Sequence, residues 1–198
     1  FNHPALDFFS RVHFSVPLLI YIPVIFYYLY KSIFVFHFSV LIIFALIVFG
    51  AAVWTFTEYN MHRFVFHWMP PGELGRKRKG RWQGGQHDYP RDSYRLVMVP
   101  AVSIPLAIAF YFAFRFILLH IFGDENLIAP FFVGFVSGYL FYDMSHYALH
   151  HANFKNKFWL DLKQHHMIHH YQEPHNGFGV STKFWDSVYR TTFKRKAG

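Results

Sequence analysis

Residues 127–151 read LIAPFFVGFVSGYLFYDMSHYALHH, and this stretch decides the fold. Its first part is a continuous apolar run, and a helix that crosses a membrane needs roughly 20 such residues. Its last part carries His146, His150 and His151. His146 and His150 are four positions apart, so a helix directs both side chains to the same face. The stretch therefore predicts a membrane-spanning helix that ends in a histidine cluster at the membrane surface.

Three further apolar stretches occupy residues 14–30, 33–54 and 96–122. The composition agrees with a lipid-facing chain, because only 15% of the residues are charged, whereas soluble domains carry about 25%. The short segments 31–32 and 123–126 would join the helices as two hairpins. We therefore predict an all-α integral membrane fold with four transmembrane helices in two hairpins, the last over residues 127–149.

Most of the 19 Lys and Arg residues lie between residues 55 and 95 or after residue 151. The positive-inside rule then places both termini and the long middle segment in the cytoplasm. We expect one domain over residues 1–198, with a cytosolic cap formed by residues 55–95 and 150–198. Basic segments beside apolar runs favour lipid head groups over nucleic acid. The expected location is the endoplasmic reticulum or a bacterial inner membrane, with no nucleic-acid partner.

Most of the 15 histidines fall on this same side of the membrane. In the tail, His166, His169 and His170 have helical spacing and are expected on one face. His62 and His67 are five positions apart, which predicts that the helix bends or ends between them. The chain has no Cys, so imidazole and carboxylate remain as metal ligands, and imidazole suits iron, zinc and copper. Histidines from several helix ends thus predict one shared metal site.

Two carboxylates lie one helical turn before candidate ligands. Glu58 precedes His62 by four positions, and Asp143 precedes His146 by three. A carboxylate that accepts a hydrogen bond from a ligating imidazole fixes its tautomer and orientation. We expect Glu58 and Asp143 to support the ligands in this way.

Five stretches carry motifs: EYNMHRFVFH at 58–67, HDYPRDSYRLVMVP at 87–100, YDMSHYALHH at 142–151, HMIHH at 166–170 and GFGVSTKFWD at 177–186. Together they resemble the fatty acid hydroxylase superfamily. The segments GFGVS and HDYPRD are similar to the fatty acid 2-hydroxylase branch rather than to sterol oxidases or carotenoid hydroxylases. The resemblance implies an O₂-dependent monooxygenase that hydroxylates C2 of fatty acyl chains, free or held in a sphingolipid such as ceramide.

The resemblance also implies two metal ions, iron for activity, with zinc able to occupy the same histidines. The implied ligands are His62, His67, His87, His146, His150, His151, His166, His169 and His170. Side chains expected near the substrate are Tyr142, Phe178, Trp185, Arg91 and Tyr94. We expect no fused cytochrome domain, so a separate b-type cytochrome, or a ferredoxin with its reductase, would donate electrons.

One motif departs from the family pattern. Where relatives read HGxHH, this chain has Gln83 and Gln86 before His87. A Gln carbonyl oxygen suits a hard cation and is a poorer ligand than imidazole for iron or zinc. Two alternatives therefore stay open beside the 2-hydroxylase. They are a related lipid desaturase or sterol oxidase, and a non-catalytic metal-binding relative with a weakened second site.

Overall fold

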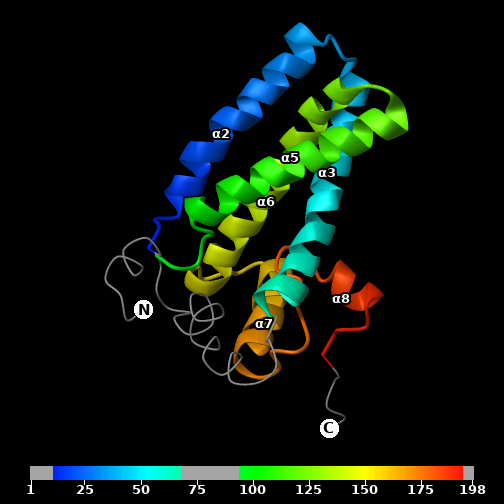
Figure 1. Ribbon diagram of the computed structural model, residues 1–198. Helices are drawn as coiled ribbons and strands as arrows, with labels where there is room; N and C mark the ends of the chain where they lie inside the picture. Colours follow the sequence, from blue (N-terminus) through cyan, green and yellow to red (C-terminus); the bar gives the residue numbers. More distant parts are fainter. Residues whose placement is uncertain (1–10, 68–93, 194–198) are drawn as a thin grey trace, which may run out of the picture.

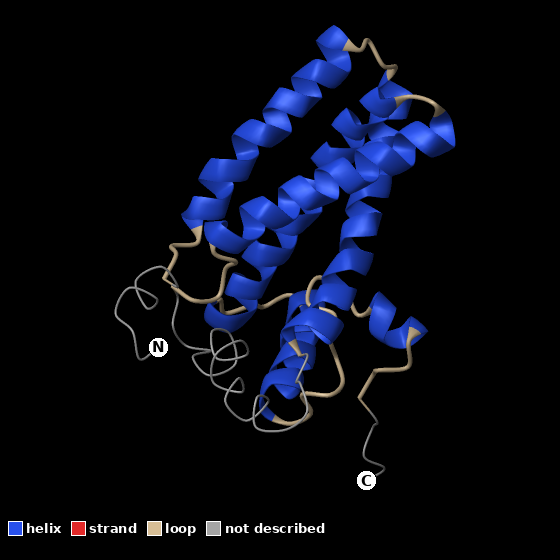
Figure 2. Ribbon diagram, viewed as in Figure 1, coloured by secondary structure: helices blue, strands red, loops and turns tan. Residues whose placement is uncertain are grey.

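The computed structural model describes residues 11–67 and 94–193, and the statements below concern these residues (Figure 1). All regular secondary structure in this part of the chain is helical (Figure 2). The segments long and apolar enough to cross a membrane are Ser15–Val35, Val40–Phe66, Pro100–Phe122 and Glu125–His151. They form an elongated bundle, with the shorter helices gathered at its lower end. The predicted all-helical fold with four spans is confirmed.

The spans comprise α2 (Ser15–Tyr30), α3 (Val40–Asn60), α5 (Pro100–Phe122) and α6 (Ile128–His151). Single π-helical turns prolong α2 and α3 over Lys31–Val35 and Met61–Phe66, and a 3₁₀ turn over Glu125–Leu127 precedes α6. The lower end contains α7 (Lys157–Tyr171) and α8 (Phe184–Val188). Both α3 and α6 thus run past the predicted spans, towards the histidines.

The first link between helices differs from the prediction. Residues 31–32 were expected to join α2 and α3, but the chain stays helical to Val35. The Ser32 hydroxyl donates to the Tyr28 carbonyl at 2.7 Å, which keeps this polar residue within the helix. The turn comes later, and the Ser39 hydroxyl caps α3 by accepting a hydrogen bond from the Ile42 N–H.

The third span begins later than predicted, at Pro100 rather than at residue 96. Proline is favoured in the first turn of a helix because its missing N–H needs no partner there. The same helix ends at Gly123, whose φ of 72° is left-handed and suits glycine. This end falls within the predicted link at residues 123–126.

The central helix of the bundle is α6. In the most apolar part of its span 72% of the residues are buried, against 11%, 17% and 11% in the corresponding parts of the other three. It contacts α2 and α5, but its most extensive contact is with α3. Gly50 and Gly134 allow this approach, since an added methyl group would overlap the carbonyl oxygens of Phe131 and Ile47 respectively. The two hairpins therefore pack through their second helices.

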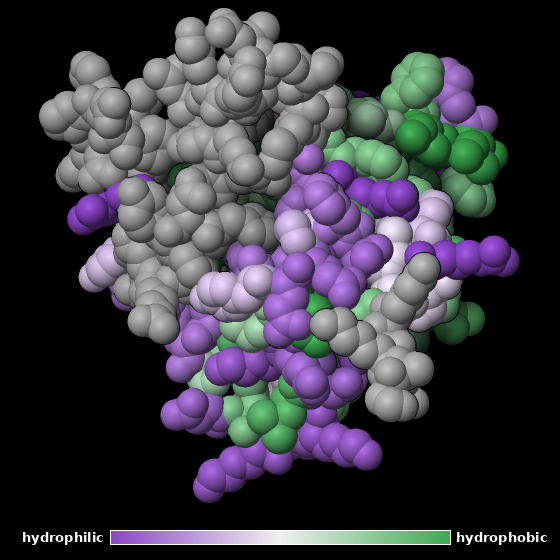
Figure 3. Space-filling model, turned by 90° about the horizontal axis from the view of Figure 1, so that it is seen from below, coloured by the Kyte–Doolittle hydropathy of each residue, from purple (hydrophilic) through white to green (hydrophobic). Residues whose placement is uncertain are grey.

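The flanks and the lower end of the molecule differ in polarity. Large apolar side chains such as Leu41 and Phe116 are exposed along the spans, as expected for surfaces that face lipid. Seen from below, the described surface is mainly hydrophilic, with apolar groups nearer its margin (Figure 3). This distribution fits an integral membrane protein whose lower end lies at the membrane surface.

Candidate metal centre

Two groups of histidines lie where α3, α6 and α7 end or meet. The ligand nitrogens within each group lie within 4.8 Å of one another. The four-histidine group contains His146, His150, His166 and His170. The three-histidine group contains His62, His67 and His169. Because α7 supplies residues to both groups, this helix joins them into one centre.

The helix was expected to bend or end between His62 and His67; instead it widens into the π-helical turn Met61–Phe66 and ends there, with His67 as the C-cap residue. The backbone N–H of His67 donates to the His62 carbonyl at 3.2 Å, which is the i to i+5 hydrogen bond of a π-helix. This wide turn brings residues five apart onto one face, with the two ring centres 4.9 Å from each other. Single π-helical turns are frequent at functional sites, so the five-residue spacing was itself the signal.

In both groups the imidazole rings direct their Nε2 atoms towards one another. The closest Nε2 atoms are 3.0 to 3.2 Å apart, in the pairs His62–His67, His67–His169, His150–His166 and His166–His170. Two nitrogens bound to one ion at about 2.05 Å would be about 2.9 Å apart in octahedral and about 3.3 Å apart in tetrahedral geometry. The arrangement and the donor type therefore fit iron or zinc.

Backbone carbonyls hold the other nitrogen of three of these rings. The Nδ1 atoms of His62, His146 and His169 lie 2.6, 2.9 and 2.6 Å from the carbonyl oxygens of Phe178, Leu96 and Asn176. A carbonyl can only accept, so Nδ1 carries the proton and the Nε2 lone pair faces the group. This is the tautomer that binds a metal ion.

The burial of the two groups also favours neutral imidazole. Burial, followed by the nearby His146 and His170, lowers the pKa of His166 well below its ordinary value. Burial likewise lowers the pKa of His169. A metal ion binds deprotonated imidazole, so the folded chain keeps these two residues ready for binding at neutral pH.

The expected contact between Glu58 and His62 is not made. The Glu58 carboxylate accepts hydrogen bonds from the backbone N–H groups of Val180 and Ser181, both at 2.9 Å, and from the Ser181 hydroxyl. These residues follow Phe178, whose carbonyl holds His62. Glu58 thus supports His62 through a loop rather than directly.

The expected direct contact between Asp143 and His146 is not made either. Its carboxylate accepts hydrogen bonds from the Met98 N–H at 3.1 Å and from the Tyr139 hydroxyl at 2.9 Å. It therefore fixes the segment in which the Leu96 carbonyl holds His146. In both cases the carboxylate binds the loop, and the loop carbonyl orients the imidazole.

Sequence reasoning missed Asp186, which is fully buried. Its carboxylate accepts hydrogen bonds from the N–H groups of Phe178 and Gly179, both at 2.9 Å, from the Thr191 hydroxyl at 2.7 Å and from His165 Nε2 at 3.1 Å. Burial raises the pKa of Asp186, but these hydrogen bonds outweigh it and leave the pKa below its ordinary value. Its place at the end of the GFGVSTKFWD stretch was the available signal.

The expected substrate residues lie in different surroundings. Tyr142 is buried, and its ring stacks on His146 with centres 5.9 Å apart. Phe178 is buried against the three-histidine group, with its ring centre 5.4 Å from that of His169. Trp185 instead donates its indole N–H to the Thr55 hydroxyl on α3. Tyr142 and Phe178 therefore border the metal centre, one at each group.

The other predicted residues stay predictions. His151 is exposed and lies against Tyr147, with ring centres 4.9 Å apart, outside both groups. Tyr94 is half exposed beside His13. The remaining positions, His87, Gln83, Gln86 and Arg91, lie outside the described residues.

Comparison with known proteins gives a consistent result. The fatty acid hydroxylase family matches residues 47–191. The ceramide very long chain fatty acid hydroxylase scs7 of Schizosaccharomyces pombe is 38% identical over 157 residues, which cover 78% of this chain and 43% of that protein. The fatty acid 2-hydroxylase of Mus musculus is 37% identical over 77% of this chain and 40% of its own length. The chain thus spans about two fifths of these relatives.

Two further similarities extend this result. The dihydroceramide fatty acyl 2-hydroxylase FAH1 of Arabidopsis thaliana is 34% identical over 77% of this chain and 62% of its own. A solved structure of scs7p, in which only the hydroxylase domain is visible, superposes with a TM-score of 0.85 at 32% identity. That superposition covers 100% of this chain and 72% of the other, so the fold is shared throughout.

Proposed function

Because the chain belongs to the fatty acid hydroxylase family, we propose that it hydroxylates C2 of fatty acyl chains, either free or within ceramide. The observation that carries this proposal is the pair of adjacent histidine groups, whose Nε2 atoms face one another at the end of the bundle. The relatives named above, a ceramide very long chain fatty acid hydroxylase and a fatty acid 2-hydroxylase, support the same substrate class.

We infer that each histidine group holds one metal ion, expected to be iron in the active protein. Bound iron and O₂ together supply the oxidant that breaking an aliphatic C–H bond requires, which no side chain can provide. The residues present neutral Nε2 atoms, while Tyr142 and Phe178 pack against the rings of His146 and His169. Electrons would come from a separate b-type cytochrome, or from a ferredoxin with its reductase.

The position of the centre suits a substrate that is dissolved in a membrane. The apolar spans lie in the bilayer, and the histidines lie at the hydrophilic end of the bundle. An acyl chain could reach this end from the hydrocarbon while its head group remains near water. We propose that this end faces the cytoplasm, in the endoplasmic reticulum or in a bacterial inner membrane.

The test is metal content followed by product analysis on the detergent-purified chain, supplied with iron, O₂, a reduced electron donor and either a fatty acid or ceramide. We expect about two metal ions per chain and a product with one hydroxyl at C2. An unsaturated product would identify a desaturase instead. One metal ion or fewer, with no product, would identify a non-catalytic relative.

Single variants separate the two histidine groups. His166→Ala should lower metal binding by the four-histidine group, and His169→Ala should lower it in the three-histidine group. His120→Ala is the matched control, because His120 is exposed on α5 and bonds only to the Phe116 carbonyl of its own helix among the described contacts. Equal metal content in all three variants would contradict the assignment of the ligands.

A further inference from the structure

A run of aromatic rings leads from the three-histidine group to the surface of the protein. The ring centre of Phe178 lies 6.0 Å from that of His62 and 6.1 Å from that of Tyr59 on α3. Tyr59 in turn stacks on Tyr189, with ring planes 10° apart and centres 5.2 Å apart. Tyr189 directly follows α8, which lies beside the lower end of α3 (Figure 1), and it is 43% exposed. Three ring contacts therefore join a candidate metal ligand to the solvent.

Hydrogen bonds follow the same route. The Tyr59 hydroxyl lies 2.9 Å from the Thr191 hydroxyl, which donates to Asp186. Because the single hydroxyl proton of Thr191 goes to Asp186, Tyr59 donates to Thr191. Asp186 also accepts from the Phe178 N–H, and the Phe178 carbonyl accepts from His62. The route from Tyr59 to His62 is thus hydrogen-bonded as well as packed.

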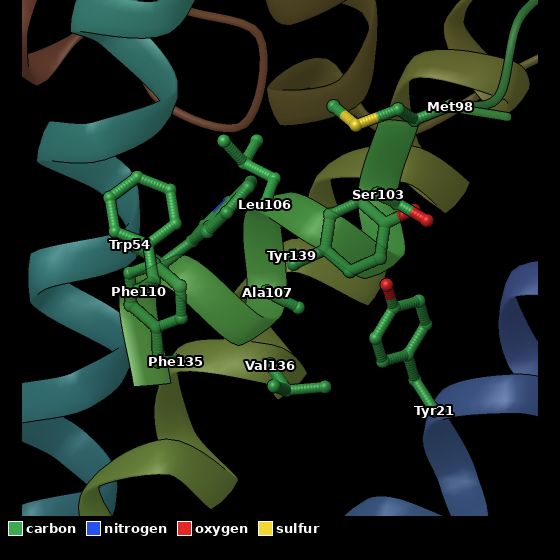
Figure 4. A pocket seen from close by; sticks show the side chains of 10 residues that line it. All are labelled: Tyr21, Trp54, Met98, Ser103, Leu106, Ala107, Phe110, Phe135, Val136 and Tyr139. Carbon is green, nitrogen blue, oxygen red and sulfur yellow. The ribbon is translucent and has the colours of Figure 1, made fainter. Parts of the chain in front are cut away.

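The rings beside the four-histidine group lead inwards instead. Tyr142, which stacks on His146, has its ring centre 6.0 Å from that of Trp54, and Trp54 lies 5.3 Å from Tyr139. Figure 4 shows Trp54, Tyr139 and Tyr21 around a small cavity of about 20 Å³ between the membrane helices. Among the described residues this run stops at Tyr21, which is only 4% exposed. It therefore does not reach a surface that a protein partner could touch.

The surface around Tyr189 is basic. The Arg63 guanidinium lies 5.9 Å from the centre of the Tyr189 ring, and the next residue in the chain, Arg190, is exposed. The acidic residue nearest in the chain, Asp186, is fully buried. Positive charge at a surface attracts a partner with an acidic face and speeds their encounter.

The composition of this surface is typical of protein interfaces. Phe64 and Val188 are 58% and 52% exposed, and the Arg63 guanidinium lies 5.0 Å from the centre of the Phe64 ring. Tyr and Arg are enriched in the cores of interfaces and carry much of the binding energy. We refer to Arg63, Phe64, Val188, Tyr189 and Arg190 as the entry patch.

We propose that the entry patch docks the electron donor of the hydroxylase, a one-electron carrier protein with an acidic face. Electrons pass from the carrier through Tyr59 and Phe178 to the three-histidine group, and the rings themselves are neither oxidised nor reduced. Electron transfer through protein slows steeply with distance, so a packed and hydrogen-bonded route from the surface favours it. This proposal rests on the proposed function. Conversion of R–H and O₂ into R–OH and water takes up two electrons and two protons, so a one-electron carrier docks twice in each turnover.

The first experiment measures docking without metal or turnover. The soluble, acidic haem domain of a b-type cytochrome is titrated onto the metal-free chain in nanodiscs of zwitterionic phosphatidylcholine. Arg190→Glu should weaken binding roughly threefold to tenfold at low salt, and less at high salt. Lys155→Glu is the matched control, because it makes the same change of charge at an exposed residue between α6 and α7. Equal affinities of the two variants would overturn the proposal, and would leave the arginines as contacts for anionic lipid.

Two substitutions of Tyr189 separate its ring from its hydroxyl. Tyr189→Ala should weaken binding of the haem domain about fivefold to thirtyfold. Tyr189→Phe keeps the ring on Tyr59 and should bind like the unchanged chain. Tyr171→Ala is the control, because Tyr171 is 61% exposed and lies against His170 of the other group, with ring centres 6.3 Å apart. A larger loss in Tyr171→Ala than in Tyr189→Ala would move the docking site there and overturn the entry patch.

The second experiment follows the electrons. The iron-loaded chain is mixed without O₂ with a low concentration of the reduced haem domain, and the haem absorbance reports its oxidation. Arg190→Glu and Tyr189→Ala should slow this oxidation by the factors measured for binding. Reduced methyl viologen, a small reductant that needs no docking surface, should react equally with all variants. Equal slowing with methyl viologen would show a damaged metal centre and contradict the proposed route.

The two proposals fail in different ways. Docking and haem oxidation without any hydroxylated product would contradict the proposed function and support the entry patch. A C2-hydroxylated product formed equally fast by Arg190→Glu and by the unchanged chain, at a limiting concentration of the haem domain, would contradict the entry patch alone.

Discussion

Replacing Asp186 with Asn tests how the loop supports the metal centre. One carboxylate oxygen of Asp186 accepts from the Phe178 N–H and the Thr191 hydroxyl, and the other accepts from the Gly179 N–H and from His165. Asn replaces one oxygen by an NH₂ group, so in either orientation one buried backbone N–H, that of Phe178 or of Gly179, faces another donor, while the Thr191 hydroxyl or the His165 ring can present an acceptor instead. At about 1–3 kcal/mol for an unsatisfied buried donor, the free energy of unfolding should fall by about 1–3 kcal/mol.

The substitution should weaken metal binding by the three-histidine group more than by the four-histidine group. The Phe178 N–H binds Asp186 and the Phe178 carbonyl binds His62, so a displaced loop loosens the three-histidine group. Changes to groups that orient ligands typically cost about 10- to 100-fold in metal affinity. Competition titrations with a chelator measure the two metal affinities. The affinity of the weaker site of the variant should fall by this factor, and that of the other site should change less.

Asp161→Asn is the matched control. Asp161 is an exposed residue of α7 that pairs with Lys183, and exposed ion pairs contribute little to stability. If Asp186→Asn matched this control in unfolding temperature and in both metal affinities, the support of His62 through the loop would be refuted.

The pH dependence of stability gives a second check on Asp186. Because the folded pKa of Asp186 is lowered, its contribution is present above about pH 3.9, is lost as pH falls through the folded pKa, and should be absent in the variant.

Three other changes have defined outcomes. Glu58→Gln should cost only about 1 kcal/mol, because one oxygen of Glu58 accepts both backbone N–H groups and the Ser181 hydroxyl can reorient to accept from the new amide. A cost of about 3 kcal/mol, the upper end of the range for Asp186→Asn, in the same unfolding assay would contradict this geometry. Gly134→Ala should part α3 from α6, because its methyl overlaps the Ile47 carbonyl, and should lower stability by about 1–3 kcal/mol in detergent unfolding. The metal-free chain should lose stability as pH falls below about 6.5. In the unfolded chain His166 binds a proton in this range, whereas in the folded chain its lowered pKa keeps it neutral, so acid favours the unfolded state. Higher unfolding temperatures in mild acid than at neutral pH would show the reverse.

The sequence predicted the four spans and the side on which the histidines gather, because apolar run length and helical spacing are local properties. It did not predict how HMIHH divides between the two groups. On a helix with about 3.6 residues per turn, His169 is rotated about 60° from His166 and about 100° from His170. Since α7 lies between the ends of α3 and α6, this rotation turns His169 towards His67 and the other two towards His150.

The support of the ligands could not be predicted from local spacing. The positions of Glu58 and Asp143, one turn before a histidine, suggested direct contacts. The observed partners of His62 and His146 are carbonyls 116 and 50 residues away in the chain. Only the folded loops bring these groups together, and a backbone carbonyl carries no sequence signature. The carboxylates could be predicted as important, but not the groups that they bind.

Each histidine group takes its ligands from α7 and from one membrane helix. The membrane helix α6 and the end of α3 supply His146, His150, His62 and His67, while α7 supplies His166, His169 and His170. Each ion would therefore link α7 to a different membrane helix. Without an ion, the lone pairs of neighbouring Nε2 atoms face one another, so metal binding should stabilise the docking of α7 more than the packing of α6. Hydrogen exchange of the chain with and without iron measures this difference. Protection should rise most over Lys157–Tyr171, whereas an equal rise along α6 would mean that the ions stabilise the whole fold rather than hold the cap to the bundle.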